Sequence, residues 1–260
     1  MELEGKVALV TGAGSGIGKA AALRLAKEGA AIGALSRTES EVRKTVGEIE
    51  RNGGRAVALV ADIAEEEPMK QAVSDLVSAF GRLDIVFANA GINGVWAPID
   101  DLAPAEWDRT IGINLRGTYL TLHYAVPHLK KAKGGAIVIT ASINGTRTFT
   151  SAGATAYSAT KAAQVAMAQM LALELAKHRI RVNAICPGHI ATSIPDNTSW
   201  RHTDEARVAA EYPDGDIPLT GGEAGTSEEV ADLVLFLVSD RARHITGTPV
   251  WIDGGQSLLV

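Results

Sequence analysis

The sequence predicts an α/β fold in which helices cover both faces of a doubly wound parallel sheet. Short apolar runs alternate with longer amphipathic segments along the whole chain, and Gly, Asn, Asp or Pro bounds each apolar run. The apolar runs are almost continuously hydrophobic, which is typical of strands buried on both faces of a parallel sheet. Regular alternation of strand and helix indicates right-handed crossovers, and these build a doubly wound sheet.

The individual elements follow from this pattern in chain order. The expected strands are Val7–Val10, Ala31–Leu35, Val57–Val60, Ile85–Ala88, Ile137–Thr140, Val182–Ile185 and Pro249–Ile252. The expected helices lie near residues 17–28, 39–52, 66–80, 105–131, 154–178 and 227–238. Pro104 and Glu228 suit the first turns of two helices, while Gly29 and Gly53 suit helix ends.

Composition and charge narrow the class of protein. The chain has 260 residues, of which 46% are hydrophobic and 21% are charged, and no linker or repeat divides it, so we expect a single domain over residues 1–260. A net charge of −5 argues against nucleic-acid binding. Cys186 is the only cysteine, so we expect neither a disulfide nor a metal site. The single cysteine favours a reducing cytoplasmic compartment, and no apolar stretch approaches membrane length, so we expect no membrane association.

A glycine-rich turn follows the first expected strand and opens the first expected helix. Glycines let the backbone approach a pyrophosphate closely, and a helix N-terminus presents free N–H groups to the anion. The spacing is G-x-x-x-G-x-G, not G-x-G-x-x-G. The candidate coenzyme-binding residues here are Gly12, Ser15, Gly16, Ile17 and Gly18.

The end of the second expected strand bears on the choice of coenzyme. A carboxylate there would bind the adenosine ribose hydroxyls, but the chain has Ser36 and Arg37, with no carboxylate before Glu39. Ser36 removes a charge that would repel a 2′-phosphate, and the Arg37 guanidinium suits binding one. NADP(H) is therefore favoured. NAD(H) remains the alternative if Arg37 stacks on adenine or faces solvent.

Tyr157 and Lys161 lie four residues apart in an alanine-rich helical segment, so they share one helix face. A nearby ammonium favours a phenolate, which matters because an ordinary tyrosine, with a pKa of about 10, is a poor base at neutral pH. Ser142 lies a short way upstream, at the end of the fifth expected strand. The three residues predict acid–base chemistry on a substrate oxygen.

The combination of these motifs resembles the short-chain dehydrogenase/reductase family over nearly the whole chain. The features that carry the resemblance are residues 11–18, Asp62, Asn89-Ala90-Gly91, Asn114, Ser142, Tyr157, Lys161 and Pro187-Gly188. The resemblance implies a Rossmann-like domain with a seven-stranded parallel sheet. It also implies nicotinamide-dependent interconversion of alcohols and carbonyls.

The resemblance assigns a role to each catalytic candidate. It implies that Tyr157 is the general acid/base, that Lys161 lowers its pKa and binds the nicotinamide ribose, and that Ser142 holds the substrate oxygen. Asn114 would kink its helix and position a water linked to the lysine. Fifteen positions separate Ser142 from Tyr157, slightly more than is usual in the family, so Ser151 and Thr155 are rival hydroxyls.

Further coenzyme contacts are implied at the ends of later strands. The resemblance places Asp62 and Ile63 at the adenine, although Asp62 also reads as a helix cap. The remaining implied contacts are Asn89, Ala90 and Gly91 after strand four, Tyr157 and Lys161, and Pro187, Gly188, Ile190 and Thr192 after strand six.

The long segment 188–226 is expected to form a lid over the substrate, because irregular stretches of this length in compact domains are often functional. It contains Ile194, Trp200, Tyr212 and Pro213 among the carboxylates of Asp196, Asp204, Glu205, Glu211, Asp214 and Asp216, and Trp96, after strand four, is expected to line the mouth of the pocket. The aromatic residues favour an apolar or cyclic small-molecule carbonyl or alcohol. Pro218–Gly222 lacks an arginine that the family often has there.

The predicted function is an NADP(H)-dependent oxidoreductase that interconverts a carbonyl and a secondary alcohol. The alternatives are an NAD(H)-dependent dehydrogenase of the same family and a nucleotide-sensing protein without catalysis. A sugar-nucleotide epimerase fits poorly, because it needs a larger C-terminal substrate region. The resemblance also implies a homotetramer formed through the helices near 105–131 and 154–178 and the C-terminal strand.

Overall fold

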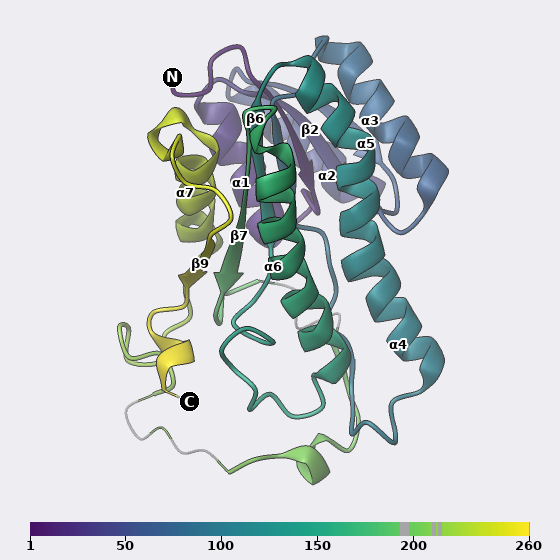
Figure 1. Cartoon of the computed structure of the whole chain (residues 1–260), viewed down its shortest axis with the longest axis vertical. Coiled ribbons are helices and arrows are strands. Elements are labelled where there is room, and N and C mark those ends of the chain that lie inside the picture. The colour runs from purple at the N-terminus through teal and green to yellow at the C-terminus, as the bar shows by residue number, and fades with distance from the viewer. Residues whose placement is uncertain (193–197, 210–211, 213–214, 260) are drawn as a thin grey trace.

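The computed structural model describes residues 1–192, 198–209, 212 and 215–259. It confirms the α/β class: one sheet of seven parallel strands has the order β3-β2-β1-β4-β6-β7-β9, with helices on both faces (Figure 1). Its strands are β1 (Val7–Thr11), β2 (Ala31–Ser36), β3 (Arg55–Val60), β4 (Ile85–Ala88), β6 (Gly135–Thr140), β7 (Ile180–Pro187) and β9 (Pro249–Ile252). The main helices are α1 (Gly16–Lys27), α2 (Glu39–Arg51), α3 (Glu66–Phe80), α4 (Pro104–Ile111), α5 (Gly117–Lys131), α6 (Thr155–Ala176) and α7 (Ser227–Val238).

Two hydrophobic cores, one on each face of the sheet, explain why the strands are apolar throughout. In β1, Val7 and Leu9 belong to the core beneath α3, α5 and α6, whereas Ala8 and Val10 belong to the core beneath α1, α2 and α7. Successive strand residues point to opposite faces, so both sets of positions must be apolar when helices cover both faces.

The carboxyl ends of the strands create the place for a site. β1 and β4 are adjacent although α1, β2, α2, β3 and α3 separate them in sequence. The chain crosses between opposite halves of the sheet at this point, where ligands bind in open α/β sheets. The segment around 198–206 lies at the lower edge of Figure 1, below the ends of β7 and β9.

The predicted helix over 105–131 is interrupted. A π-helical turn, η1 (Gly112–Arg116), separates α4 from α5. The main-chain oxygen of Asn114 accepts hydrogen bonds from Thr118 Oγ1 at 2.7 Å and from Gln164 Nε2 at 2.9 Å, and the Asn114 side chain bonds to the backbone of Ile92. Such side-chain insertions disturb the regular helical ladder.

Two short strands were not expected from the sequence. β5 (Gly94–Trp96) pairs in parallel with β8 (Thr198–Trp200), and Trp96 stands opposite Trp200. Three-residue strands are too short to show alternation, so only the fold brings them together.

Within the part of the chain that the structure describes, none of the helices has the length and apolarity needed to cross a bilayer.

Candidate active site

The glycine-rich turn between β1 and α1 packs so closely that side chains would not fit. Gly12 has φ +69°, and a Cβ there would lie 2.9 Å from Asn89 Nδ2. A Cβ on Gly18 would collide with the carbonyl oxygen of Gly12. Gly16, the first residue of α1, has φ +50°. The turn therefore exposes backbone next to a helix N-terminus, a cradle that suits a pyrophosphate.

Asn89 joins three strand ends behind this turn. Its Nδ2 donates to the Thr11 carbonyl at 3.2 Å, and its Oδ1 accepts from Thr140 Oγ1 at 3.1 Å. The backbone amides of Asn89 and Ala90 both donate to Thr11 Oγ1. These contacts fix the ends of β1, β4 and β6 relative to one another.

One end of the cavity carries the polar groups expected for an adenosine. Ser36, Arg37, Asp62 and Ile63 line this end. The Asp62 carboxylate also accepts from Ala64 N at 2.9 Å, but α3 begins only at Glu66, so Asp62 forms a turn ahead of the helix and is not its cap.

The structure adds a carboxylate that the sequence reasoning missed. Glu41, in the first turn of α2, lines the cavity at the same end as Ser36. A Cβ built on Gly14 would lie 2.8 Å from Glu41 Oε2 and 3.0 Å from Ser36 Oγ, so the two side chains face the same spot. The expected position for a ribose-binding carboxylate is the end of the strand, and nothing in the sequence pattern points to a residue inside the following helix.

The other end of the cavity brings together Ser142, Tyr157 and Lys161. Tyr157 and Lys161 are buried in α6, at 9% and 4% exposure, and Ser142 follows β6. The Ser142 side chain lies near enough to Tyr157 to lower the pKa of the phenol. Lys161 Nζ lies 5.4 Å from the centre of the Tyr157 ring and donates to the Thr140 carbonyl at 2.8 Å.

The electrostatics of this group differ from the expectation for Tyr157. Burial raises the pKa of Tyr157, and the neighbouring Ser142 hydroxyl offsets that effect only in part. The pKa of the buried phenol is therefore raised, whereas the sequence led us to expect that Lys161 would lower it. Burial instead lowers the pKa of Lys161 itself to about 8, because desolvation disfavours its charged form.

Asn114 lies behind the cavity, not in its lining. Its Oδ1 accepts from Ile92 N and its Nδ2 donates to Ile92 O, both at 2.8 Å, and Nδ2 also bonds to Thr160 Oγ1 at 3.2 Å. A Cβ on Gly91 would lie 3.1 Å from Asn114 Oδ1 and 3.8 Å from Lys161 Nζ, so Gly91 leaves the gap between them open.

We expect Lys161→Met to raise the free energy of unfolding by about 2 kcal/mol at pH 7. A shift from 10.5 to about 8 corresponds to roughly 3 kcal/mol, at about 1.4 kcal/mol per pKa unit, and losing the bond to the Thr140 carbonyl returns about 1 kcal/mol. The penalty is complete below pH 8, where both states are protonated, and fades between pH 8 and 10.5 as the folded state alone loses its proton.

Urea denaturation of both proteins at pH 7 and pH 10, at equal protein concentration, measures this difference. The advantage of the Met variant should shrink at pH 10. An advantage of the same size at both values, or a less stable Met variant at pH 7, would contradict a buried-charge penalty at Lys161.

Most of the predicted site residues line one continuous cavity of about 750 Å³. They are Gly12, Ser15, Gly16, Ile17, Ser36, Arg37, Asp62, Ile63, Asn89, Ala90, Gly91, Ser142, Tyr157, Lys161, Pro187, Gly188, Ile190 and Thr192. Gly18 and Asn114 are not in the lining. Of the rival hydroxyls, Ser151 lines the cavity and donates to Asn144 Oδ1 at 2.7 Å, whereas Thr155 does not line it.

The substrate-lid residues are described only in part. Trp200, Tyr212 and Asp216 line the cavity, as does Trp96. Ile194, Asp196, Glu211, Pro213 and Asp214 lie outside the described residues. Asn93, Asn144 and Thr198 also line the cavity, and no sequence pattern predicts them because they become neighbours only through the fold.

Comparison with known proteins agrees with this architecture. A family model described as enoyl-(acyl carrier protein) reductase matches residues 12–257. A 3-ketoacyl-ACP reductase from Sinorhizobium meliloti is 63% identical, with a TM-score of 0.94 and coverage of 98% of this chain and 100% of that one. A 3-ketoacyl-(acyl-carrier-protein) reductase from Brucella melitensis, complexed with NADH, is 35% identical, with a TM-score of 0.86 and coverage of 98% and 99%.

A cyclohexanol dehydrogenase from Acinetobacter is 39% identical over 252 residues, which cover 97% of this chain and 95% of that protein. These similarities extend over nearly the full length of the chain and include the parallel seven-stranded sheet. The chain therefore belongs to the short-chain dehydrogenase/reductase family and is an NAD(P)-dependent oxidoreductase that acts on CH–OH or C=O groups.

Proposed function

We propose that the protein interconverts a carbonyl and a secondary alcohol by hydride transfer, with Tyr157 as the general acid/base and NADP(H) as the preferred coenzyme. The observation that carries the proposal is the position of the Ser142 and Tyr157 side chains in the same cavity as the glycine-rich turn, where Ser142 is near enough to act on the phenol. A phenol beside a serine hydroxyl suits proton exchange with an oxygen held between them.

Each residue of the group then has a task that follows from its position. A bound nicotinamide coenzyme supplies the hydride. The Tyr157 hydroxyl gives its proton to the carbonyl oxygen, and Ser142 holds that oxygen by a second hydrogen bond. Burial keeps the pKa of Tyr157 high, so the phenol is protonated at neutral pH, which is the form that reduction requires.

Lys161 and Asn114 act behind the reacting oxygen in this scheme. Lys161 is anchored on the Thr140 carbonyl, beside the Tyr157 ring, from where its ammonium favours the phenolate that forms when the proton leaves. Asn114, held by Ile92 and Thr160, keeps the π-helical turn in place opposite Gly91 and Lys161.

The adenosine end supports the choice of NADP(H). Arg37 is exposed at the cavity edge and forms no ion pair with any described residue, so its guanidinium can take a 2′-phosphate, while Ser36 adds no charge. The negative charge of the Glu41 carboxylate would repel a 2′-phosphate there, which counts against NADP(H). NAD(H) is the alternative, favoured by Glu41 and by the NADH in the Brucella structure.

Coenzyme absorbance in the presence of a panel of ketones and secondary alcohols tests the proposed reaction. Turnover of at least one carbonyl is expected. Tight coenzyme binding without turnover of any compound would instead favour a nucleotide-sensing role.

We further propose that residues 1–260 form one catalytic domain with a substrate lid over 188–226. The proposal is supported by contacts between the described part of that segment and the loop after β4. Asn93 Nδ2 bonds to Thr198 Oγ1 at 2.8 Å, and Arg201 N donates to the Trp96 carbonyl at 3.0 Å.

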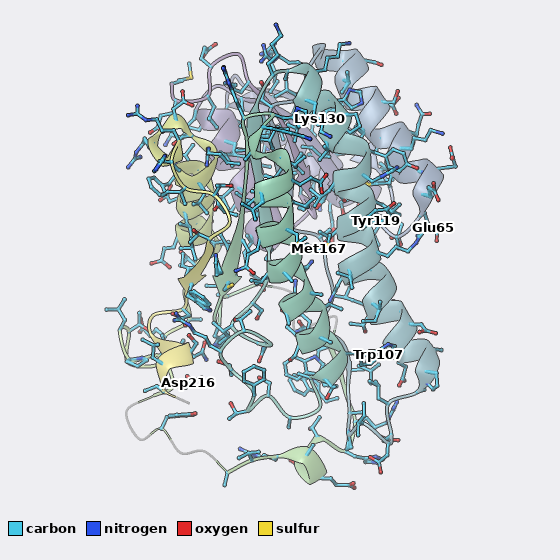
Figure 2. The ribbon with its side chains drawn as sticks, viewed as in Figure 1. Glu65, Trp107, Tyr119, Lys130, Met167 and Asp216 are labelled. Atoms are coloured by element: carbon cyan, nitrogen blue, oxygen red, sulfur yellow. The ribbon has the colours of Figure 1, made fainter. Side chains whose placement is uncertain are left out.

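A homotetramer is the proposed assembly. Tyr119 on α5 and Met170 and Leu173 on α6 are 50%, 72% and 82% exposed, and Figure 2 shows α5 and α6 side by side with Tyr119 and Met167 on them. Apolar side chains gathered on neighbouring helices are typical of an interface. Sedimentation at micromolar concentration should give a species about four times the 27.2 kDa chain, and a 27.2 kDa particle would contradict this assembly.

A further inference from the structure

An aromatic wall stands beside the Tyr157 hydroxyl. The Trp96 ring lies 6.1 Å from the Tyr157 ring, and Trp200 meets Trp96 edge-on at 4.7 Å, with an angle of 64° between the planes. All three residues line the cavity, and Trp200 is 60% exposed. Two indole rings in a cavity next to a polar hydroxyl form a surface for a flat or cyclic apolar body.

Specific contacts hold this wall in place. β5 and β8 pair so that Trp96 and Trp200 are opposite each other, and Trp96 Nε1 donates to the Asn93 carbonyl at 3.2 Å. Beyond Trp200, the Arg201 guanidinium bonds to Asp101 Oδ2 at 2.8 Å and to both Glu106 oxygens at 2.9 Å. The arginine thus fastens the 198–206 segment, at the lower edge of Figure 1, to the loop ahead of α4 and to the first turn of α4.

Because these contacts pair Arg201 with carboxylates, its positive charge is not free to bind an anionic substrate. Two carboxylates neutralise Arg201, and residues 98–108 contain four carboxylates and no lysine or arginine. Among the described residues that line the cavity, the lysine and arginine side chains are those of Arg37 and Lys161, and His189 also lines it. Arg37 lies at the adenosine end. The lining residues that lie next to the wall in sequence or bond to one another there are neutral, such as Asn93 with Thr198 and Asn144 with Ser151. A substrate with phosphate groups would find no partner there.

We propose that the substrate is an uncharged cyclic ketone or its secondary alcohol, whose ring lies against Trp96 and Trp200 while its oxygen meets Tyr157 and Ser142. This inference rests on the proposed function. In the reductive direction the carbonyl carbon accepts a hydride from the reduced nicotinamide, and the oxygen accepts the proton of Tyr157. The coenzyme is oxidised as the ketone is reduced.

Three probes separate the substrate classes: cyclohexanone, the open-chain 2-hexanone with the same number of carbons, and acetoacetyl-CoA, an anionic thioester. We expect kcat/KM to be about tenfold or more higher for cyclohexanone than for 2-hexanone, and lowest for acetoacetyl-CoA. A preference for acetoacetyl-CoA would overturn the inference while upholding the proposed reaction.

Variants of Trp200 test whether the aromatic wall causes the preference for cyclohexanone. Trp200→Ala should lower kcat/KM for cyclohexanone about tenfold, mainly by raising KM, and should change kcat/KM for 2-hexanone by less than about threefold. Trp200→Phe keeps an aromatic ring and should retain most of the activity with cyclohexanone. Phe149→Ala is the matched control, because Phe149 is 75% exposed and does not line the cavity. Equal losses for both ketones in Trp200→Ala would overturn the inference.

Calorimetry with cyclohexanone in the presence of coenzyme separates the two proposals if no probe is turned over. Binding that Trp200→Ala weakens would support the cyclic substrate and count against the proposed reaction. Absence of binding would overturn the inference.

Discussion

Replacing Tyr157 by Phe is expected to lower kcat for carbonyl reduction about a thousandfold, because general acid catalysis contributes two to four orders of magnitude in rate. The change removes one oxygen from a buried ring and keeps the contact with Trp96. Coenzyme affinity should stay within about twofold, because the glycine-rich turn and the adenosine end are untouched. Steady-state turnover and coenzyme fluorescence titration measure the two quantities.

Tyr124→Phe provides the matched control. The Tyr124 hydroxyl donates to Glu66 Oε1 at 2.8 Å, on the outer side of α3 and α5, and does not line the cavity. Its loss should leave turnover unchanged. Activity in Tyr157→Phe close to that of the unaltered protein would exclude the phenol as the proton donor.

The strands and the glycine-rich turn could be predicted because local sequence determines them. Strands covered on both faces must be apolar at every position, as in Val7–Thr11, and that pattern is visible without knowing the partners. The turn needs residues without Cβ at Gly12 and Gly18, because Asn89 and the Gly12 carbonyl occupy the space. Such requirements appear directly in the residue types.

The π-helical turn and the β5–β8 pair could not be predicted, because contacts distant in sequence create them. Asn114 leaves the regular helix where it bonds to Ile92 and where Gln164 reaches its carbonyl from α6. Trp200 joins the wall only after β8 pairs with β5, about a hundred residues earlier in the chain. Neither partner leaves a periodic signal in the sequence.

The electrostatics of Tyr157 show a second limit of sequence reasoning. The four-residue spacing correctly placed Lys161 near the Tyr157 ring, but spacing does not report burial. Both groups are buried, so desolvation raises the pKa of the phenol and lowers that of the amine. On an exposed helix face, the same four-residue spacing would change the pKa of the phenol and of the amine only slightly.

Arg37→Ala is expected to lower kcat/KM with NADPH by about 30-fold or more and to change the value with NADH by less than about threefold. A charge-assisted bond between a guanidinium and a phosphate contributes about 1.5–3 kcal/mol, or roughly 10- to 150-fold. The effect should fall almost wholly on KM, since the 2′-phosphate is far from the reacting atoms. Ser36→Asp should act in the same direction, because it adds a carboxylate where the phosphate would bind.

Glu41→Gln, at the same end of the cavity as Arg37, is expected to raise kcat/KM with NADPH, which is opposite to the effect of Arg37→Ala. The Glu41 carboxylate faces Ser36 across Gly14, so its neutralisation should improve kcat/KM with NADPH about threefold while leaving NADH unchanged. Ser40→Ala, on the exposed side of the same helical turn, controls for general effects on α2. The contrary outcome is that the unaltered protein prefers NADH and that Glu41→Gln lowers kcat/KM with NADH. Ser36 and Arg37 would then not bind the 2′-phosphate of NADPH. Glu41 would then be the carboxylate that accepts hydrogen bonds from the ribose hydroxyls, a role that sequence reasoning sought at the end of β2.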